Sequence, residues 1–346
     1  MKITANKAIK VITTIVAVRY VYTVIKKSFG SLCLGCALAI TGTALAADFP
    51  EKALRIVVPY TPGGFNDTLA RTVGAELAKV WNQAVVVDNR PGGNTTVGNN
   101  IAAKSQPDGY TILITPLPFS ALPGLYGNQL PYDALKDFAP LVHAGSTQNV
   151  LTVRNDLPIN NVKELLDYAK KNPGKINYGS TGSGSSNHLS MELLMRMTDT
   201  KMTHIPYKGS AQAVLAMLGG EIDVLFDNLP NVLTQIKAGK LKGIAVTGSE
   251  RAYLLPALPT VAEAGVPGYE VNVWFGMQVP AGTPKPLIDT INREIVKILK
   301  QPEIIKKFRD QGVEVVASTP AAFGQLVQTE VIKWTQVIRD ANIRIE

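Results

Sequence analysis

The fold of this chain is decided by the segment 54–67, LRIVVPYTPGGFND. Its first five residues form a short apolar run rich in β-branched side chains, which is typical of a buried strand. Prolines and glycines then turn the chain. Apolar residues follow at Leu69, Val73 and Leu77, and this spacing predicts a helix over about 66–80 with one buried face. A strand that passes directly into a helix is the repeating unit of α/β folds.

The same pattern extends along the chain. We expect strands at 84–87 and 111–114 and a helix near 96–104, and the apolar strands suit a parallel sheet covered by helices. After residues 151–153 the alternation restarts, with Ser210 expected to cap a helix over 211–218. The part beyond residue 250 has few strands and is expected to complete the first block. These readings predict two α/β lobes packed across a hinge, lobe 1 being 48–145 and 248–346 and lobe 2 being 146–247.

Residues 1–47 have the composition of a secretory signal. Their only charges are six lysines and arginines, an apolar stretch covers 32–45, and small residues end the segment. We expect cleavage near Ala46 or Ala47 and a periplasmic mature protein. An N-terminal membrane anchor is the alternative, although the apolar stretch is shorter than the roughly 20 residues of a spanning helix.

Removal of this segment changes the charge and the cysteine content. The whole chain has 35 Lys and Arg against 27 Asp and Glu, so the mature chain keeps 29 against 27 and a net charge of +2. The basic character therefore gives no support for nucleic-acid binding. Both cysteines, Cys33 and Cys36, lie in the segment, so thiolate metal sites are excluded from the mature chain. A lipid on Cys36 remains an alternative, because Leu34-Gly35-Cys36 partly matches a lipoprotein cleavage box.

Four loops follow predicted strands, where ligands bind in open α/β sheets. The first is the Pro-Gly-Gly loop, 62–67, and the second is the Gly/Ser loop, 179–188, in which eight consecutive residues are Gly, Ser or Thr. The third is the Tyr-Lys-Gly loop, 206–210, and the fourth is 226–230, FDNLP. Free N–H and hydroxyl donors before a helix favour an anion such as a carboxylate. In the same order, the simpler alternatives are a tight strand-to-helix turn, a flexible surface loop, a solvated Lys208 and a helix cap.

Catalysis and metal binding find little support in the sequence. The Gly/Ser loop lacks the G-x-S-x-G order of a serine hydrolase and the order of either nucleotide-binding glycine motif. The three histidines, His143, His188 and His204, form no H-x-x-x-H pair. We therefore expect a protein that is not an enzyme, with no cofactor and no metal. A hydrolase using Ser185 is the competing hypothesis.

Six motifs occur in one order along 48–346: PYTPGGFND at 59–67, NRPG at 89–92, PDGYT at 107–111, YGS with the Gly/Ser loop and HL at 178–189, PYKG at 206–209 and DNLP at 227–230. Together they resemble the extracytoplasmic solute receptors of tripartite tricarboxylate transporters, the Bug family. The resemblance implies a type II periplasmic-binding-protein-like fold and a small mono-, di- or tricarboxylate ligand. It also implies a ligand cleft between the two lobes, with the second loop in one wall. In the family this loop often reads RPGAGG, whereas RPGGN at 90–94 is shorter by two residues, so the family's contacts in this wall do not carry over in detail.

The resemblance also implies a ligand site and partners. One ligand carboxylate would meet the Gly/Ser and Tyr-Lys-Gly loops, and the opposite end would meet the Pro-Gly-Gly loop. The expected ligand-binding residues are Phe65, Asn66, Asp67, Thr181, Gly184, Ser185, Ser186, His188, Tyr207, Lys208, Gly209 and Asp227. The expected partners are a carboxylate and the membrane permease subunits of the transporter, with the receptor itself a monomer that binds no nucleic acid. A periplasmic sensor that feeds a membrane signalling partner would use the same cleft and stays open as an alternative.

Overall fold

The computed structural model describes residues 49–340 and residue 343, and the chain from Pro50 onward forms one unit. The predicted signal segment, with Cys33, Cys36 and the expected cleavage site, lies outside the described residues. Within the described part, no helix is both long and apolar enough to cross a membrane.

The segment that opens the fold forms β1 (Leu54–Val58) and passes into α2 (Phe65–Trp81). Strand β1 lies between β2 (Val85–Asn89) and β3 (Thr111–Pro116) and is parallel to both. Helix α3 (Thr96–Ala103) connects β2 to β3. The predicted parallel strand–helix alternation is confirmed for this first sheet. The apolar residues of β1 are buried, as expected for a central strand covered on both faces.

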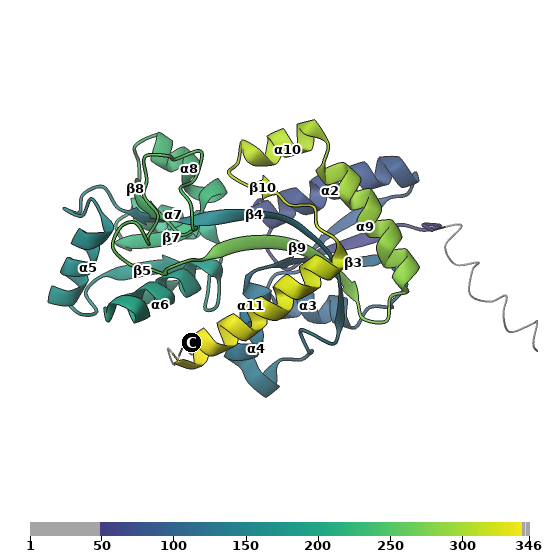
Figure 1. The fold of residues 1–346 in the computed structure, drawn as a ribbon, viewed down its shortest axis with the longest axis horizontal. Helices are drawn as coiled ribbons and strands as arrows, with labels where there is room; N and C mark the ends of the chain where they lie inside the picture. Colours follow the sequence, from purple (N-terminus) through teal and green to yellow (C-terminus); the bar gives the residue numbers. More distant parts are fainter. Residues whose placement is uncertain (1–48, 341–342, 344–346) are drawn as a thin grey trace, which may run out of the picture. The chain divides into compact units, whose positions relative to one another are not determined.

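A long strand, β4 (Phe138–Val153), belongs to two sheets (Figure 1). Its part up to Gln148 pairs with β9 (Asn272–Pro280), which lies antiparallel between β3 and β4. Its last five residues pair with β7 (Val224–Asn228) and β8 (Lys242–Val246) of the second sheet. We expected only residues 151–153 to be a strand here. The pairing of β4 with β9 has two register shifts, which interrupt the alternation expected of a strand. The strand also contains Gly145, where a Cβ would lie 2.6 Å from the backbone oxygen of Glu314. For these reasons the sequence pattern did not predict the earlier part of β4.

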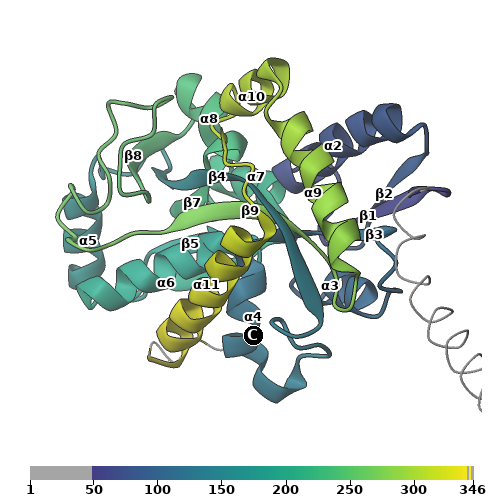
Figure 2. The same cartoon turned by 45° about the vertical axis from the view of Figure 1, so that its right-hand side comes forward.

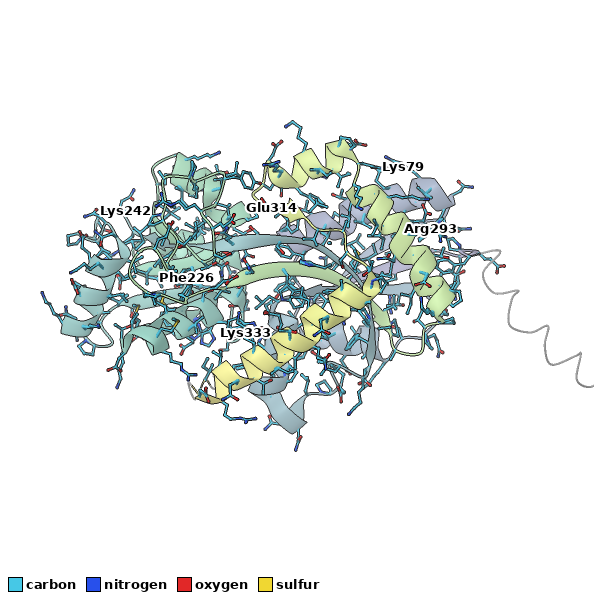
Figure 3. The ribbon with its side chains drawn as sticks, viewed as in Figure 1. Lys79, Phe226, Lys242, Arg293, Glu314 and Lys333 are labelled. Carbon is cyan, nitrogen blue, oxygen red and sulfur yellow. The ribbon has the colours of Figure 1, made fainter. Side chains whose placement is uncertain are left out.

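The second sheet has the order β4-β7-β5-β6, and β8 pairs with β4. Its parallel core consists of β5 (Asn177–Ser180) between β6 (Thr203–Pro206) and β7. Phe226 of β7 is fully buried in the interior of this half (Figure 3). The helices of this half are α5 (Val162–Lys171), α6 (Ser186–Thr198), α7 (Ser210–Leu218) and α8 (Leu229–Lys237). Three of them, α6, α7 and α8, are the next elements along the chain after β5, β6 and β7.

The C-terminal part returns to the first sheet. Strand β10 (Glu314–Val315) pairs with β4, and α9 (Lys285–Leu299) and α10 (Pro302–Arg309) precede it. Helix α11 (Pro320–Asp340) packs against β4 and against α4 (Pro118–Tyr126), a helix the sequence did not lead us to expect (Figure 2). The short η2 (Gly127–Gln129) follows α4. The expectation that this part completes the first block agrees with these pairings, while the exact lobe boundaries stay a prediction.

Candidate functional site

The candidate site lies where β5, β6 and β7 end and α6, α7 and α8 begin. Parallel strands bring their carboxyl ends to one edge of the sheet, so the Gly/Ser loop, the Tyr-Lys-Gly loop and the start of α8 meet there. The first N–H groups of a helix have no acceptor within the helix. Three helix starts therefore bring unpaired donors and positive dipole ends together, which favours an anion.

The Gly/Ser loop holds its own shape through side chains. The Gly182 amide donates to Ser180 Oγ at 3.0 Å, and the Gly184 amide donates to His188 Nδ1 at 3.1 Å. Ser185 caps α6, since its Oγ accepts from the His188 amide at 3.3 Å. These two glycine amides are occupied within the protein. The ligand donors that remain are the hydroxyl hydrogens of the serines at the helix start and the first amides of α6.

His188 supports the loop from within the protein. It is buried, and its ring centroid lies 4.4 Å from that of His204 and 6.2 Å from that of Tyr178. Its Nε2 lies 3.6 Å from Oε1 of Glu192, which also accepts from the Tyr178 hydroxyl at 2.6 Å. Burial, and secondly the nearby His204, lower the pKa of His188 to about 3. The ring is therefore neutral, and its Nδ1 is free to accept from the loop.

The predicted residues of the Tyr-Lys-Gly loop have unequal surroundings. The Tyr207 amide donates to the Ser180 carbonyl at 2.9 Å, which joins this loop to the Gly/Ser loop. Lys208 is exposed. A Cβ at Gly209, as at Gly182, would meet no atom within 4 Å, so both loops border open space. Ser210 does not cap α7 as expected. The helix begins one residue earlier, and the Ser210 hydroxyl donates to Asp227.

Asp227 is deeply buried at the end of β7, and only 1% of its surface is exposed. Burial raises the pKa of its carboxyl group, although four hydrogen bonds, one each from Ser210, Asn231, Asn228 and Asn187, act in the opposite direction. The expectation that Asp227 contacts the ligand is not tested by these contacts, but they occupy its carboxylate within the protein.

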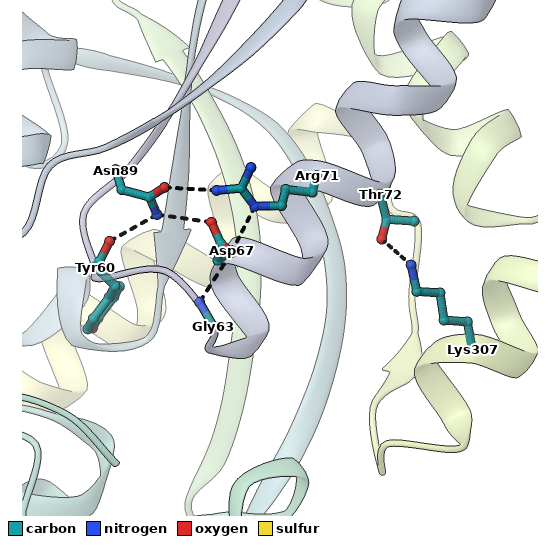
Figure 4. Close-up of polar contacts among 7 residues, drawn as sticks. All are labelled: Tyr60, Gly63, Asp67, Arg71, Thr72, Asn89 and Lys307. Carbon is teal, nitrogen blue, oxygen red and sulfur yellow. Dashed lines mark hydrogen bonds and ion pairs between the residues drawn. The ribbon is translucent and has the colours of Figure 1, made fainter. Parts of the chain in front are cut away.

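Asp67, in the Pro-Gly-Gly loop, also accepts several hydrogen bonds from within the protein (Figure 4). Its carboxylate accepts from the Gly63 amide at 3.2 Å, from Arg71 Nε at 2.9 Å and from Asn89 Nδ2 at 3.0 Å. Asn89 Nδ2 also donates to the Tyr60 carbonyl at 3.1 Å. Burial alone would raise the pKa of Asp67, but these hydrogen bonds outweigh burial and lower it. Asp67 therefore stays ionised and ties the start of α2 to the end of β2.

The other two predicted residues of this loop point to different roles. The ring of Phe65 is buried, with its centroid 4.6 Å from that of Phe275 and 5.1 Å from that of Phe308, so it anchors the loop in the core. The side-chain oxygen of Asn66 is buried and has no hydrogen-bond partner within the described part of the chain. A buried acceptor of this kind is normally satisfied by water or a ligand.

Two residues outside the predicted set connect the two halves at the Gly/Ser loop. Asn94 Nδ2 donates to the Ser183 carbonyl. A Cβ at Gly184 would lie 2.3 Å from Leu125 Cδ1 and 2.8 Å from Asn94 Nδ2. Asn94 follows Arg90-Pro91-Gly92-Gly93, the loop in which this chain departs from the Bug pattern, and that departure was the one sequence signal at this position.

The predicted residues thus form two groups. The Gly/Ser, Tyr-Lys-Gly and β7-end residues meet at one edge of the second sheet, while the Pro-Gly-Gly residues lie at the end of β1 in the first sheet. No group of three or more His, Cys, Asp or Glu among the described residues could hold a metal ion.

Comparison with known proteins decides the family. The sequence model of a protein family, the tripartite tricarboxylate transporter family receptor, matches residues 69–343 of this chain. This chain belongs to that receptor family. Protein BugT of Bordetella pertussis is 32% identical to it over 317 residues, which are 90% of this chain and 97% of BugT.

Solved structures agree with this assignment. Rpa4515 of R. palustris, solved with adipate, is 35% identical, with a TM-score of 0.81 over 86% of this chain and 99% of that one. The periplasmic binding protein BugD is 35% identical, with a TM-score of 0.80 over 86% of this chain and all of its own. MatC of Rhodopseudomonas palustris, with bound malate, is 30% identical, with a TM-score of 0.78 over 84% of this chain and all of its own.

These findings confirm three expectations. The chain is a Bug-type receptor, its fold is that of the α/β periplasmic binding proteins, and it is a receptor rather than an enzyme. The individual ligand contacts stay predictions.

Proposed function

We propose that this receptor works in the periplasm and captures a small carboxylate between its two lobes. Lobe 1 consists of residues 48–145 and 248–346, and lobe 2 of residues 146–247. The receptor then delivers the carboxylate to the permease subunits of a tripartite tricarboxylate transporter. Family membership and the adipate and malate held by solved relatives support this proposal. The observation that carries it is the convergence of three helix starts and two serine hydroxyls, Ser185 and Ser186, at one edge of the second sheet.

The chemistry of this edge suits a carboxylate. Neutral N–H and O–H donors at helix ends bind a carboxylate through charge-assisted hydrogen bonds without a buried arginine. The Ser185 and Ser186 oxygens already accept from the His188 amide and from Asn228 Nδ2, so their hydroxyl hydrogens are the ones left to donate. A buried cation is therefore not required, and Lys208 at the exposed rim would only attract the anion.

A thermal-shift and calorimetry panel tests the ligand class. The panel contains adipate, malate, succinate, citrate and an uncharged amide of each acid. An acid at 100 times its Kd should add about 2.7 kcal/mol of stability, whereas its amide should add none. A receptor that responds to no acid in such a panel, or equally to acid and amide, would contradict the proposal.

A matched pair of variants tests the site. Ser185→Ala removes both the α6 cap and a ligand donor, whereas Asn161→Ala removes the corresponding cap of α5, where the Asn161 side chain accepts from the Glu164 amide. Each cap loss should cost about 1 kcal/mol of stability. Only Ser185→Ala should also raise Kd, by roughly tenfold, because a charge-assisted hydrogen bond is lost. Equal ligand affinity in both variants would mean that the ligand carboxylate binds elsewhere and not at the start of α6.

Delivery to a permease needs a cellular test. Uptake of the labelled acid should fall when the receptor is removed and return when the wild-type chain is supplied. Unchanged uptake together with a lost transcriptional response to the acid would favour the sensor role instead.

A further inference from the structure

The side chain of Asp227 joins three helix starts. Its Oδ1 accepts from Asn187 Nδ2 on α6 at 3.0 Å, from Asn231 Nδ2 on α8 at 2.9 Å and from the Asn228 amide at 2.7 Å. Its Oδ2 accepts from the hydroxyl of Ser210, the first residue of α7. Each of the helices α6, α7 and α8 thus contributes at least one donor to a single carboxylate.

These contacts reach the candidate ligand loops. Asn187 holds the Phe226 carbonyl at 2.7 Å with the same amide nitrogen, and its Oδ1 accepts from the Thr181 hydroxyl at 2.7 Å. Asp227 therefore orients Asn187, and Asn187 orients the Gly/Ser loop at Thr181. On the other side, Ser210 follows Gly209 directly, so its hydrogen bond sets the position of the Tyr-Lys-Gly loop.

The carboxyl group is already occupied within the protein. Oδ1 accepts from three donors although it offers about two lone-pair positions, and Oδ2 accepts from Ser210. The side chain is buried, and no Lys or Arg is among the partners that the described residues give it. Neutral donors and the positive ends of the helix dipoles surround the carboxyl group instead, and the donors oppose the rise in its pKa that burial causes.

We propose that Asp227 is a positioning residue, which fixes the spacing of the α6, α7 and α8 starts and thereby places the ligand donors without touching the ligand. This inference rests on the proposed function. It replaces our expectation that Asp227 itself contacts a ligand group. The geometry implies that the loss of one carboxylate oxygen as acceptor weakens every carboxylate ligand by the same factor.

The decisive variant is Asp227→Asn, in which an NH₂ group faces donors that now lack an acceptor. Its matched control is Asp223→Asn, just before the amino end of the same strand, where Asp223 accepts from the Asn177 amide at 2.8 Å and lies 3.3 Å from Arg154. Two measurements are made on the full mature chain of each variant. One is the set of ligand-free amide signals of Thr181 and Ser210 by NMR, and the other is the affinity for succinate, malate and adipate.

The expected result is a shift of both amide signals in Asp227→Asn and neither in Asp223→Asn. The affinity of Asp227→Asn should fall roughly tenfold to a hundredfold, because displaced donors form weaker hydrogen bonds with the charged ligand, and by one common factor for each acid that the wild type binds. A loss confined to malate, the acid with a hydroxyl donor, would mean that Asp227 contacts the ligand and would overturn the inference. Unchanged amide signals and affinity would overturn it as well.

The proposed function and the inference fail in different ways. A wild-type chain that binds no acid contradicts the function, while the amide signals still report on positioning. If Asp227→Asn does not fold, Ser210→Ala removes only one of the four donors. It should shift the Thr181 signal and weaken the acids by a smaller common factor, and an unshifted signal with wild-type affinity would overturn the inference.

Discussion

The substitution Gly184→Ala measures how tightly the two halves meet at the Gly/Ser loop. Gly184 has a φ of +81°, and an added Cβ would lie 2.3 Å from Leu125 Cδ1. The left-handed backbone costs an alanine about 1–2 kcal/mol, and pushing the end of the Leu125 side chain away from its rotamer costs about 0.5–1.5 kcal/mol more. We therefore expect the free energy of unfolding to fall by about 1.5–3.5 kcal/mol, and the melting temperature to fall by about 2–6 °C.

Two further variants separate these contributions. Gly182→Ala is the matched control, because Gly182 has a φ of +112° in the same loop but no atom within 4 Å of the added Cβ. The double variant Gly184→Ala with Leu125→Ala relieves the contact and leaves the backbone strain. Denaturant unfolding should give a coupling energy of about 0.5–1.5 kcal/mol between positions 184 and 125. Strictly additive effects of the two substitutions would refute the contact between the halves.

Three other perturbations follow from the site. Asp67→Asn should destabilise the chain by about 1–3 kcal/mol at pH 7. Because the pKa of Asp67 is lowered on folding, this deficit should vanish in melts as the pH falls through the lowered pKa, and a constant deficit would contradict the ion pair. Folding lowers the pKa of His188 to about 3, so the wild type should lose about 1.4 kcal/mol per pH unit below 6.5, and His188→Gln should flatten this slope in urea titrations at pH 7 and pH 5. Asn94→Ala removes the donor to the Ser183 carbonyl and should speed ligand dissociation roughly three- to tenfold in stopped-flow traces, a result that an unchanged rate would exclude.

Local patterns in the sequence predicted the elements and the loops that carry the site. The run 54–58 gave the central strand, and the Gly/Ser loop was found because eight small residues stand directly before a helix. These signals are short-range, so they survive without any knowledge of the packing.

Contacts between distant residues were beyond local patterns. Asp67 meets Asn89, which is 22 positions away, and Asp227 meets Asn187, which is 40 positions away. The sequence does not distinguish a buried carboxylate that is hydrogen-bonded within the protein from one that binds a ligand. The same holds for Asn94, whose contact with Ser183 spans 89 positions.

The position of β9 in the middle of the first sheet determines when this sheet can form during synthesis of the chain. Strand β9 lies between β3 and β4, so the first sheet has a gap until residues 272–280 are present. A growing chain that has not yet emerged from the ribosome as far as Pro280 cannot close this sheet. Pairings between segments so distant in the chain form slowly, because a long loop must first be closed. The first sheet can therefore be completed only after most of the chain has been synthesised.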